Sequence, residues 1–213
     1  MNSLNFKHSI IFFNLCILLS PIYHALTYTL TILCLFLILI IGISHGALDN
    51  IKGEKLFKLL GFNSNLLFYL SYIFISLLII LTWLIFPNIV LLIFLIVASF
   101  HFGKEDTVFK VKKNFLLNEI LFFFKGSSVI IAPLLFHRES TNEIFSTLNF
   151  YVFESTFFKD YLLIIFLLLS FFSSVYLSIG KSTDKKNIMI LDYFSIIILN
   201  IFLTPVLAFT IYF

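Results

Sequence analysis

Two histidines in this chain lie in settings that favour metal binding. His45 closes one apolar stretch, within residues 42–50 (GISHGALDN), and His101 closes another, within residues 98–106 (ASFHFGKED). Each is followed by a glycine within two residues and by a carboxylate four or five residues on. Imidazole is the commonest protein ligand for metals, and its second nitrogen is usually held by a carboxylate or a carbonyl. We therefore expect His45 and His101 to be metal ligands.

The carboxylates Asp49 and Asp106 are placed to orient these two imidazoles. Residues four apart share one helical face if the helix continues through the glycine. The small residues around each histidine would also let helix backbones approach closely. The competing interpretation is that both histidines are ordinary helix-end residues beside charged loops.

A third polar stretch contains Lys125, Gly126, two serines, Pro133 and His137. Ionisable groups at membrane depth are expensive and are functional candidates by default. The stretch is typical of a kinked helix that lines a cavity, although Lys125 could instead extend its amine to the membrane surface. His137 is expected near the membrane face opposite His45 and His101, so its role stays open.

Transmembrane helices are the elements that must position these residues. The chain has 213 residues, of which 61% are hydrophobic and 12% charged, whereas soluble domains are about 45–50% apolar and about 25% charged. The formal net charge of +3 indicates no nucleic-acid partner. We expect an all-α, polytopic integral membrane protein, with a single membrane domain over residues 1–213 and no soluble domain.

The predicted architecture is about seven transmembrane helices plus the start of an eighth, because a span needs about 20 apolar residues. The predicted spans are 8–22, 26–45, 65–86, 88–103, 114–136, 160–180 and 187–203, with a partial span at 205–213. Pro205 is expected to break the last apolar run, since proline removes a helical hydrogen bond. Residues 138–159 are mixed in polarity and are expected to include a short amphipathic helix along the interface.

Lysines are concentrated in alternate connections, those after the second, fourth and sixth predicted spans. By the positive-inside rule, these connections and the N-terminus are cytoplasmic. We therefore expect a multi-pass protein of the cell inner membrane. Both His45 and His101 then end their spans at the cytoplasmic side, so they share one depth in the bilayer.

The motifs resemble a known family. Residues 45–49 (HGALD) and 99–103 (SFHFG), together with Asp106, resemble the two N-terminal signatures of the Brp/Blh family. Residues 125–137 are similar to its third motif, although Arg138 stands where the family has proline. Residues 205–213 (PVLAFTIYF) resemble the opening of the fourth motif, so the resemblance covers about 40–213.

The resemblance implies a membrane β-carotene 15,15'-dioxygenase, a non-haem iron oxygenase. Such an enzyme splits the central double bond of β-carotene with O₂ and gives two molecules of all-trans-retinal, the chromophore of a microbial rhodopsin. It implies Fe²⁺ as cofactor, with His45 and His101 as ligands. An aromatic-lined cavity between the spans would suit a long apolar polyene arriving from the lipid bilayer.

The family's fourth motif continues into a His-Ser-x-x-His element that supplies two more ligands. This element would lie beyond Phe213, so we expect the chain to be a fragment that shows little activity alone. An inactive relative is the other interpretation, and the downstream DNA would decide between them.

Two further functions remain open from the sequence. A membrane transporter could use Glu119, Lys125 and Asp192 as an ion path. An assembly protein could help a rhodopsin mature without performing chemistry.

Overall fold

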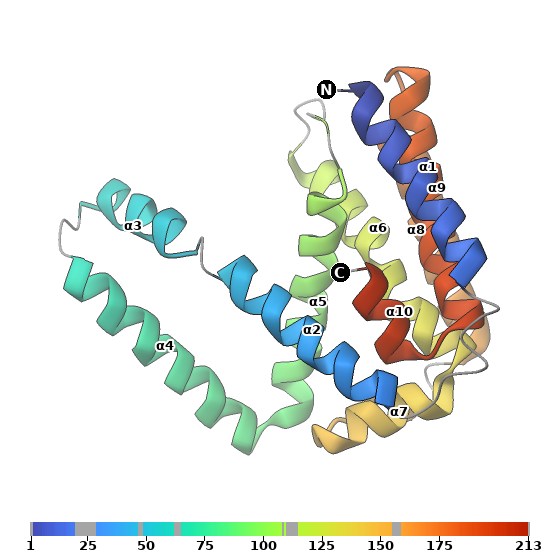
Figure 1. Cartoon of the computed structure of the whole chain (residues 1–213). Coiled ribbons are helices and arrows are strands. Elements are labelled where there is room, and N and C mark those ends of the chain that lie inside the picture. The colour runs from blue at the N-terminus through green and yellow to red at the C-terminus, as the bar shows by residue number, and fades with distance from the viewer. Residues whose placement is uncertain are drawn as a thin grey trace.

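The structure, a computed structural model, describes residues 2–19, 29–46, 49–61, 65–107, 109, 115–154 and 159–212. Within these ranges the regular structure is helical, and no strand is present. The helices are shown in Figure 1. This confirms the predicted all-α class.

The helices have the following bounds, in chain order. They are α1 (Asn2–Leu19), α2 (Thr29–Gly46), α3 (Asp49–Leu59), α4 (Asn65–Ile85), α5 (Pro87–Glu105), α6 (Phe115–Phe136), α7 (Arg138–Thr147), α8 (Asp160–Leu177), α9 (Thr183–Phe202) and α10 (Pro205–Tyr212), with a 3-10 turn at Val152–Glu154.

Among the described residues, four helices are long and apolar enough to cross a membrane. They are α4, α5, α6 and α8, with apolar segments Leu66–Ile85, Pro87–Glu105, Leu116–Phe136 and Asp160–Leu177. This supports a membrane protein, whereas the predicted seven or eight spans are not confirmed. In α1 the apolar helical segment, Lys7–Leu18, is shorter than a span.

Two local expectations are confirmed. The helical structure is interrupted between α9 and α10, where Leu203 adopts an extended conformation and Pro205 begins the next helix. Proline is well suited to a first helical position because its missing N–H has no partner there in any case. Residues 138–159 contain the short helix α7, although its place at a membrane interface stays a prediction.

Helix α3 was not expected. Its 11 residues carry both acids and lysines, and the sequence pattern predicts only a charged connection there. The predicted spans otherwise agree with the observed helices to within a few residues at most ends, because long apolar runs define them.

The bundle is built around α6, which packs against both α5 and α8. Helix α1 lies against α9, and α2 lies in front of the bundle against α10 (Figure 1). Helix α4 extends away from the bundle and contacts chiefly the adjoining α5 and α3. Side chains from α6, α8 and α9 and from the 150–153 segment form the largest buried apolar cluster.

Two glycines bring α5 and α6 into backbone contact. A methyl group added to Gly103 would overlap the carbonyl of Phe122, and one added to Gly126 would overlap the carbonyl of Ser99. Small residues of this kind allow membrane helices to approach closely. The contact explains physically why a glycine follows His101 and another follows Lys125.

Gly126→Ala should therefore destabilise the protein, by about 1–3 kcal/mol for an overpacked site. The measurement is the free energy of unfolding in detergent micelles. Gly42→Ala is the matched control, since a methyl group there meets nothing within 4 Å. Equal stability of the two variants would contradict the backbone contact.

Candidate active site

His101 lies near the C-terminal end of α5, and the helix continues past it. Helix α5 runs to Glu105, and the Asp106 backbone N–H donates to the Phe102 carbonyl at 3.0 Å. The helix therefore passes through Gly103, as the predicted pairing of His101 with a carboxylate requires. The His101 side chain is exposed, and its charge lies within electrostatic range of Asp106.

His45 occupies the corresponding place in α2, one residue before the helix ends at Gly46. Its side chain, like that of Asp49, lies outside the described residues. Asp49 begins α3, and residues 47 and 48, which separate it from α2, lie outside the described residues. The roles of both residues remain predictions.

Polar side chains from distant parts of the chain meet at the end of α5. We call Asp106, Thr107, Lys125 and Tyr212 the polar cluster. The Tyr212 hydroxyl donates to Asp106 Oδ2 at 2.6 Å, and Lys125 Nζ donates to Thr107 Oγ1 at 3.1 Å. Lys125 is only 5% exposed, so its amine is held inside the bundle and does not extend to the surface.

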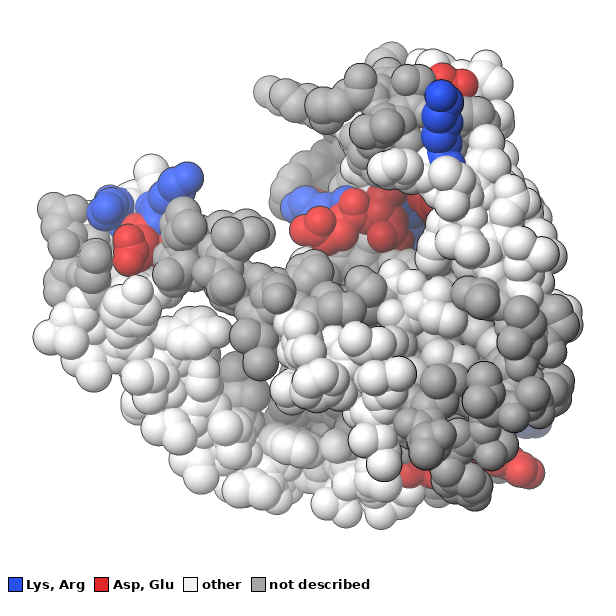
Figure 2. All heavy atoms as spheres, in the orientation of Figure 1, with Lys and Arg blue, Asp and Glu red and all other residues white. Residues whose placement is uncertain are grey.

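The cluster balances charges that burial makes costly. Burial raises the pKa of the Asp106 carboxyl above its usual value, while the Lys125 ammonium and the Tyr212 hydroxyl oppose this shift. Asp192 of α9 also lies within electrostatic range of Lys125, and Ser9 of α1 hydrogen-bonds to Asp192. Figure 2 shows acidic and basic side chains gathered in the hollow near the middle of the molecule.

An apolar cavity of about 310 Å³ lies beside the polar cluster. Five helices line it: α2 with Leu35 and Ile38, α5 with Phe94, Leu95, Ala98 and Phe102, α6 with Val129, Ile130 and Pro133, α7 with Thr141, Ile144 and Phe145, and α10 with Pro205, Val206 and Phe209. Phe102 joins the cavity to the cluster, because its ring centroid lies 5.8 Å from that of Tyr212. A hydrocarbon in the cavity would thus approach the helix end that carries His101.

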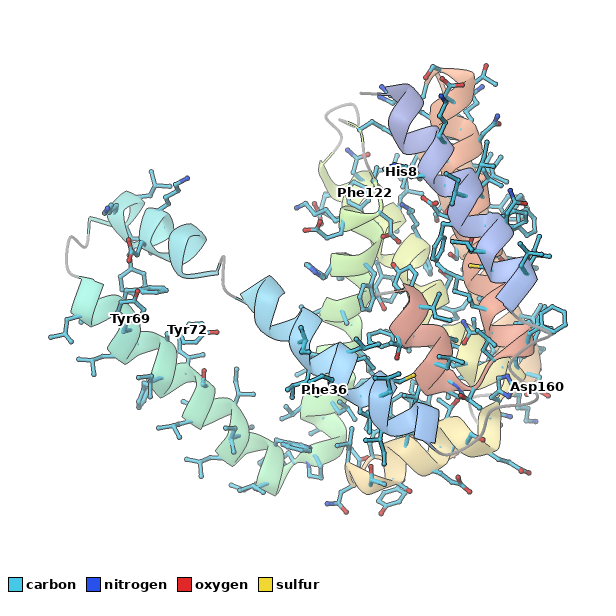
Figure 3. All side chains as sticks on the ribbon, in the orientation of Figure 1. His8, Phe36, Tyr69, Tyr72, Phe122 and Asp160 are labelled. Atoms are coloured by element: carbon cyan, nitrogen blue, oxygen red, sulfur yellow. The ribbon has the colours of Figure 1, made fainter. Side chains whose placement is uncertain are left out.

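His137 lies away from these residues, at the junction of α6 and α7. It precedes α7, and twelve residues separate it from Lys125, which corresponds to about 18 Å along a helix. The neighbouring Arg138 pairs with Asp160 at 2.9 Å. Figure 3 shows Asp160 at the end of the molecule opposite His8 and Phe122, so His137 and the polar cluster are at different ends.

Comparison with known families gives a match over most of the chain. A family described as beta-carotene 15,15'-dioxygenase matches residues 36–213. The chain belongs to this family. No curated protein and no solved structure matches the chain significantly.

The dioxygenase family match covers both predicted ligands and every helix that contributes to the cavity apart from the start of α2. It also covers three members of the polar cluster whose motifs are far apart in the sequence: Asp106, Lys125 and Tyr212. The motifs are therefore adjacent in space at the end of α5, where Tyr212 donates to Asp106 and Lys125 lies within electrostatic range of Asp106.

Two contributors to this site had no role in the sequence interpretation. Tyr212 lies in the fourth motif, but nothing local indicates that its hydroxyl reaches Asp106. Thr107 gave no signal at all. Its hydroxyl accepts a hydrogen bond from the Lys125 amine and donates one to the Gly103 carbonyl at 2.7 Å. Only the packing of α10 and α6 against α5 reveals these contacts.

Tyr212→Phe tests the cluster. The change keeps the ring that contacts Phe102 but removes the hydrogen bond to Asp106, and a buried acceptor left unsatisfied costs about 1–3 kcal/mol. We expect a loss of that size in the free energy of unfolding in detergent. The control is Tyr161→Phe in α8, where the tyrosine is 60% exposed; comparable losses in the two variants would refute the role of the bond.

Proposed function

We propose that this protein cleaves the central double bond of β-carotene with O₂ to give two molecules of all-trans-retinal. The observation that carries the proposal is the dioxygenase family match over residues 36–213. The cavity supports it, since its lining is almost wholly apolar and reaches the helix end with His101. We further propose that the protein works in the cell inner membrane, N-terminus in the cytoplasm, and supplies retinal to a microbial rhodopsin.

We also propose Fe²⁺ as the cofactor, with His45 and His101 among its ligands. Figure 1 shows α2 crossing in front of α5, and both helices line the cavity before they end. His45 lies seven residues beyond Ile38, and His101 lies three residues beyond Ala98. Each histidine thus follows a stretch of its helix that lines the cavity, which supports the proposal.

Two imidazoles are fewer ligands than iron usually takes, so the proposal includes further donors. Among the described residues no group of three or more His, Cys, Asp or Glu side chains could hold a metal. Non-haem iron sites bind through imidazole and carboxylate and keep open positions at which O₂ is activated.

The chain's own residues would perform three tasks. The apolar lining would hold the polyene and exclude water from it. The α5–α6 backbone contact would hold the His101 helix end in place relative to that lining. The polar cluster would balance the Asp106 carboxyl with the Lys125 ammonium and hydrogen-bond it to the Tyr212 hydroxyl, so that no unpaired charge faces the hydrocarbon.

The test uses cells that make β-carotene and express the complete reading frame. We expect these cells to lose their colour and to accumulate retinal, and His45→Ala or His101→Ala should abolish both effects. The same two variants should lower the iron bound per purified protein, whereas His8→Ala, an exposed residue of α1, should change neither measurement.

Membrane insertion of each variant is confirmed by fractionation. Undiminished bleaching in His45→Ala or His101→Ala would exclude that residue as a ligand. Wild-type cells that keep their colour and contain no retinal would refute the proposed reaction.

A further inference from the structure

The residues that line the apolar cavity extend along two helices, α5 and α10. On α5 its lining runs upward from Phe94 to Phe102, and on α10 it runs from Pro205 to Phe209 (Figure 1). Both stretches ascend in the picture, so the lining of the cavity extends along α5. Phe102 lies eight positions beyond Phe94, which corresponds to a length of about 12 Å along the helix.

The upper end of the cavity adjoins the candidate active site. Phe102 follows His101 directly, and its ring lies 6.1 Å from that of Phe209 and 5.8 Å from that of Tyr212. A molecule that extends along the cavity past Phe102 therefore reaches the polar cluster and the end of α5.

The lower end is formed by α7, which crosses below the bundle (Figure 1). Thr141, Ile144 and Phe145 contribute to the lining there. Phe145 is braced by Phe150 and Phe153, with ring centroids 5.4 and 5.6 Å away. The Thr141 hydroxyl lies 3.0 Å from the Pro133 carbonyl and 2.8 Å from the His137 carbonyl, which ties α7 to the end of α6.

The lining selects by shape. Among the described residues of the lining, Thr141 is the only one with a polar side chain; it is 4% exposed, and its hydroxyl donates to a backbone carbonyl. Lipid tails are as apolar as this lining, so an apolar ligand gains little from transfer alone. Close contact with the walls must supply the preference, as dispersion forces do in a packed interior. The cavity is therefore expected to prefer a hydrocarbon that fits its walls over freely bending lipid tails.

We propose that this cavity holds one half of the carotenoid, with its terminal ring against α7 and its polyene directed past Phe102 toward His101. Helix α7 then acts as the end wall that sets how deep the ring enters, and so which double bond lies beside the site. This assignment rests on the proposed carotenoid-cleaving function.

Binding to the full chain in lipid nanodiscs tests the assignment without cleavage or iron. Tritiated β-ionone represents the ring with a short tail, and tritiated all-trans-retinal represents the ring with half the polyene. Ile144→Trp fills the ring end and should weaken binding of both ligands at least tenfold. Ala98→Trp obstructs the polyene end and should weaken retinal binding at least tenfold but β-ionone binding less than threefold.

Ile164→Trp is the matched control, because Ile164 lies on α8 away from the cavity and is exposed to a similar extent as Ile144. It should bind both ligands as the wild type does. Ile144→Phe is a milder second variant, and its losses should follow those of Ile144→Trp in smaller measure. Circular dichroism and size-exclusion chromatography check that each variant is folded.

Unchanged β-ionone binding in both Ile144 variants, or equal loss of β-ionone in Ile144→Trp and Ala98→Trp, would overturn the proposal. Wild-type binding no greater than that of empty nanodiscs would overturn it as well. The bleaching of carotenoid-producing cells is scored separately. Cells that keep their colour while the binding pattern is as expected would refute the reaction and leave the cavity assignment standing.

Discussion

The backbone contact between α5 and α6 determines where the functional side chains lie. Gly103 and Gly126 face one another at the point of contact, and any larger side chain would separate the helices. His101 lies two residues before the first glycine, and Lys125 lies directly before the second. Because the contact is made by backbone atoms, side-chain rotation cannot loosen it. The crossing of α5 and α6 thus sets where the backbones of His101 and Lys125 lie.

Much of the fold follows from local signals in the sequence. The apolar runs predict α4, α5, α6 and α8 closely, and Pro205 predicts the break before α10. These features depend on residues within one or two helical turns, so a single sequence carries them. The number of spans cannot be predicted in the same way. Helices such as α9 combine apolar and charged residues, so their length alone does not decide whether they cross the membrane.

The arrangement of the candidate site is only partly contained in such signals. The end positions of His45 and His101 are local features, and the motifs at Asp106 and Lys125 could be recognised. The hydrogen bond from Tyr212 to Asp106 joins residues 106 positions apart, and no periodicity indicates it. The pairing of His45 with Asp49 stays a prediction, because residues 47–48 and the side chains of both residues lie outside the described part of the chain.

The bond between Tyr212 and Asp106 also has a consequence for the order in which the protein is assembled. A chain is synthesised from its N-terminus, so α5 and α6 can meet in the membrane well before α10 exists. The wall of the cavity that α10 supplies, and the hydrogen bond from Tyr212 to Asp106, can form only after Pro205–Tyr212 has been made. The two glycines of α5 and α6 can therefore meet before the tyrosine that donates to Asp106 is in place.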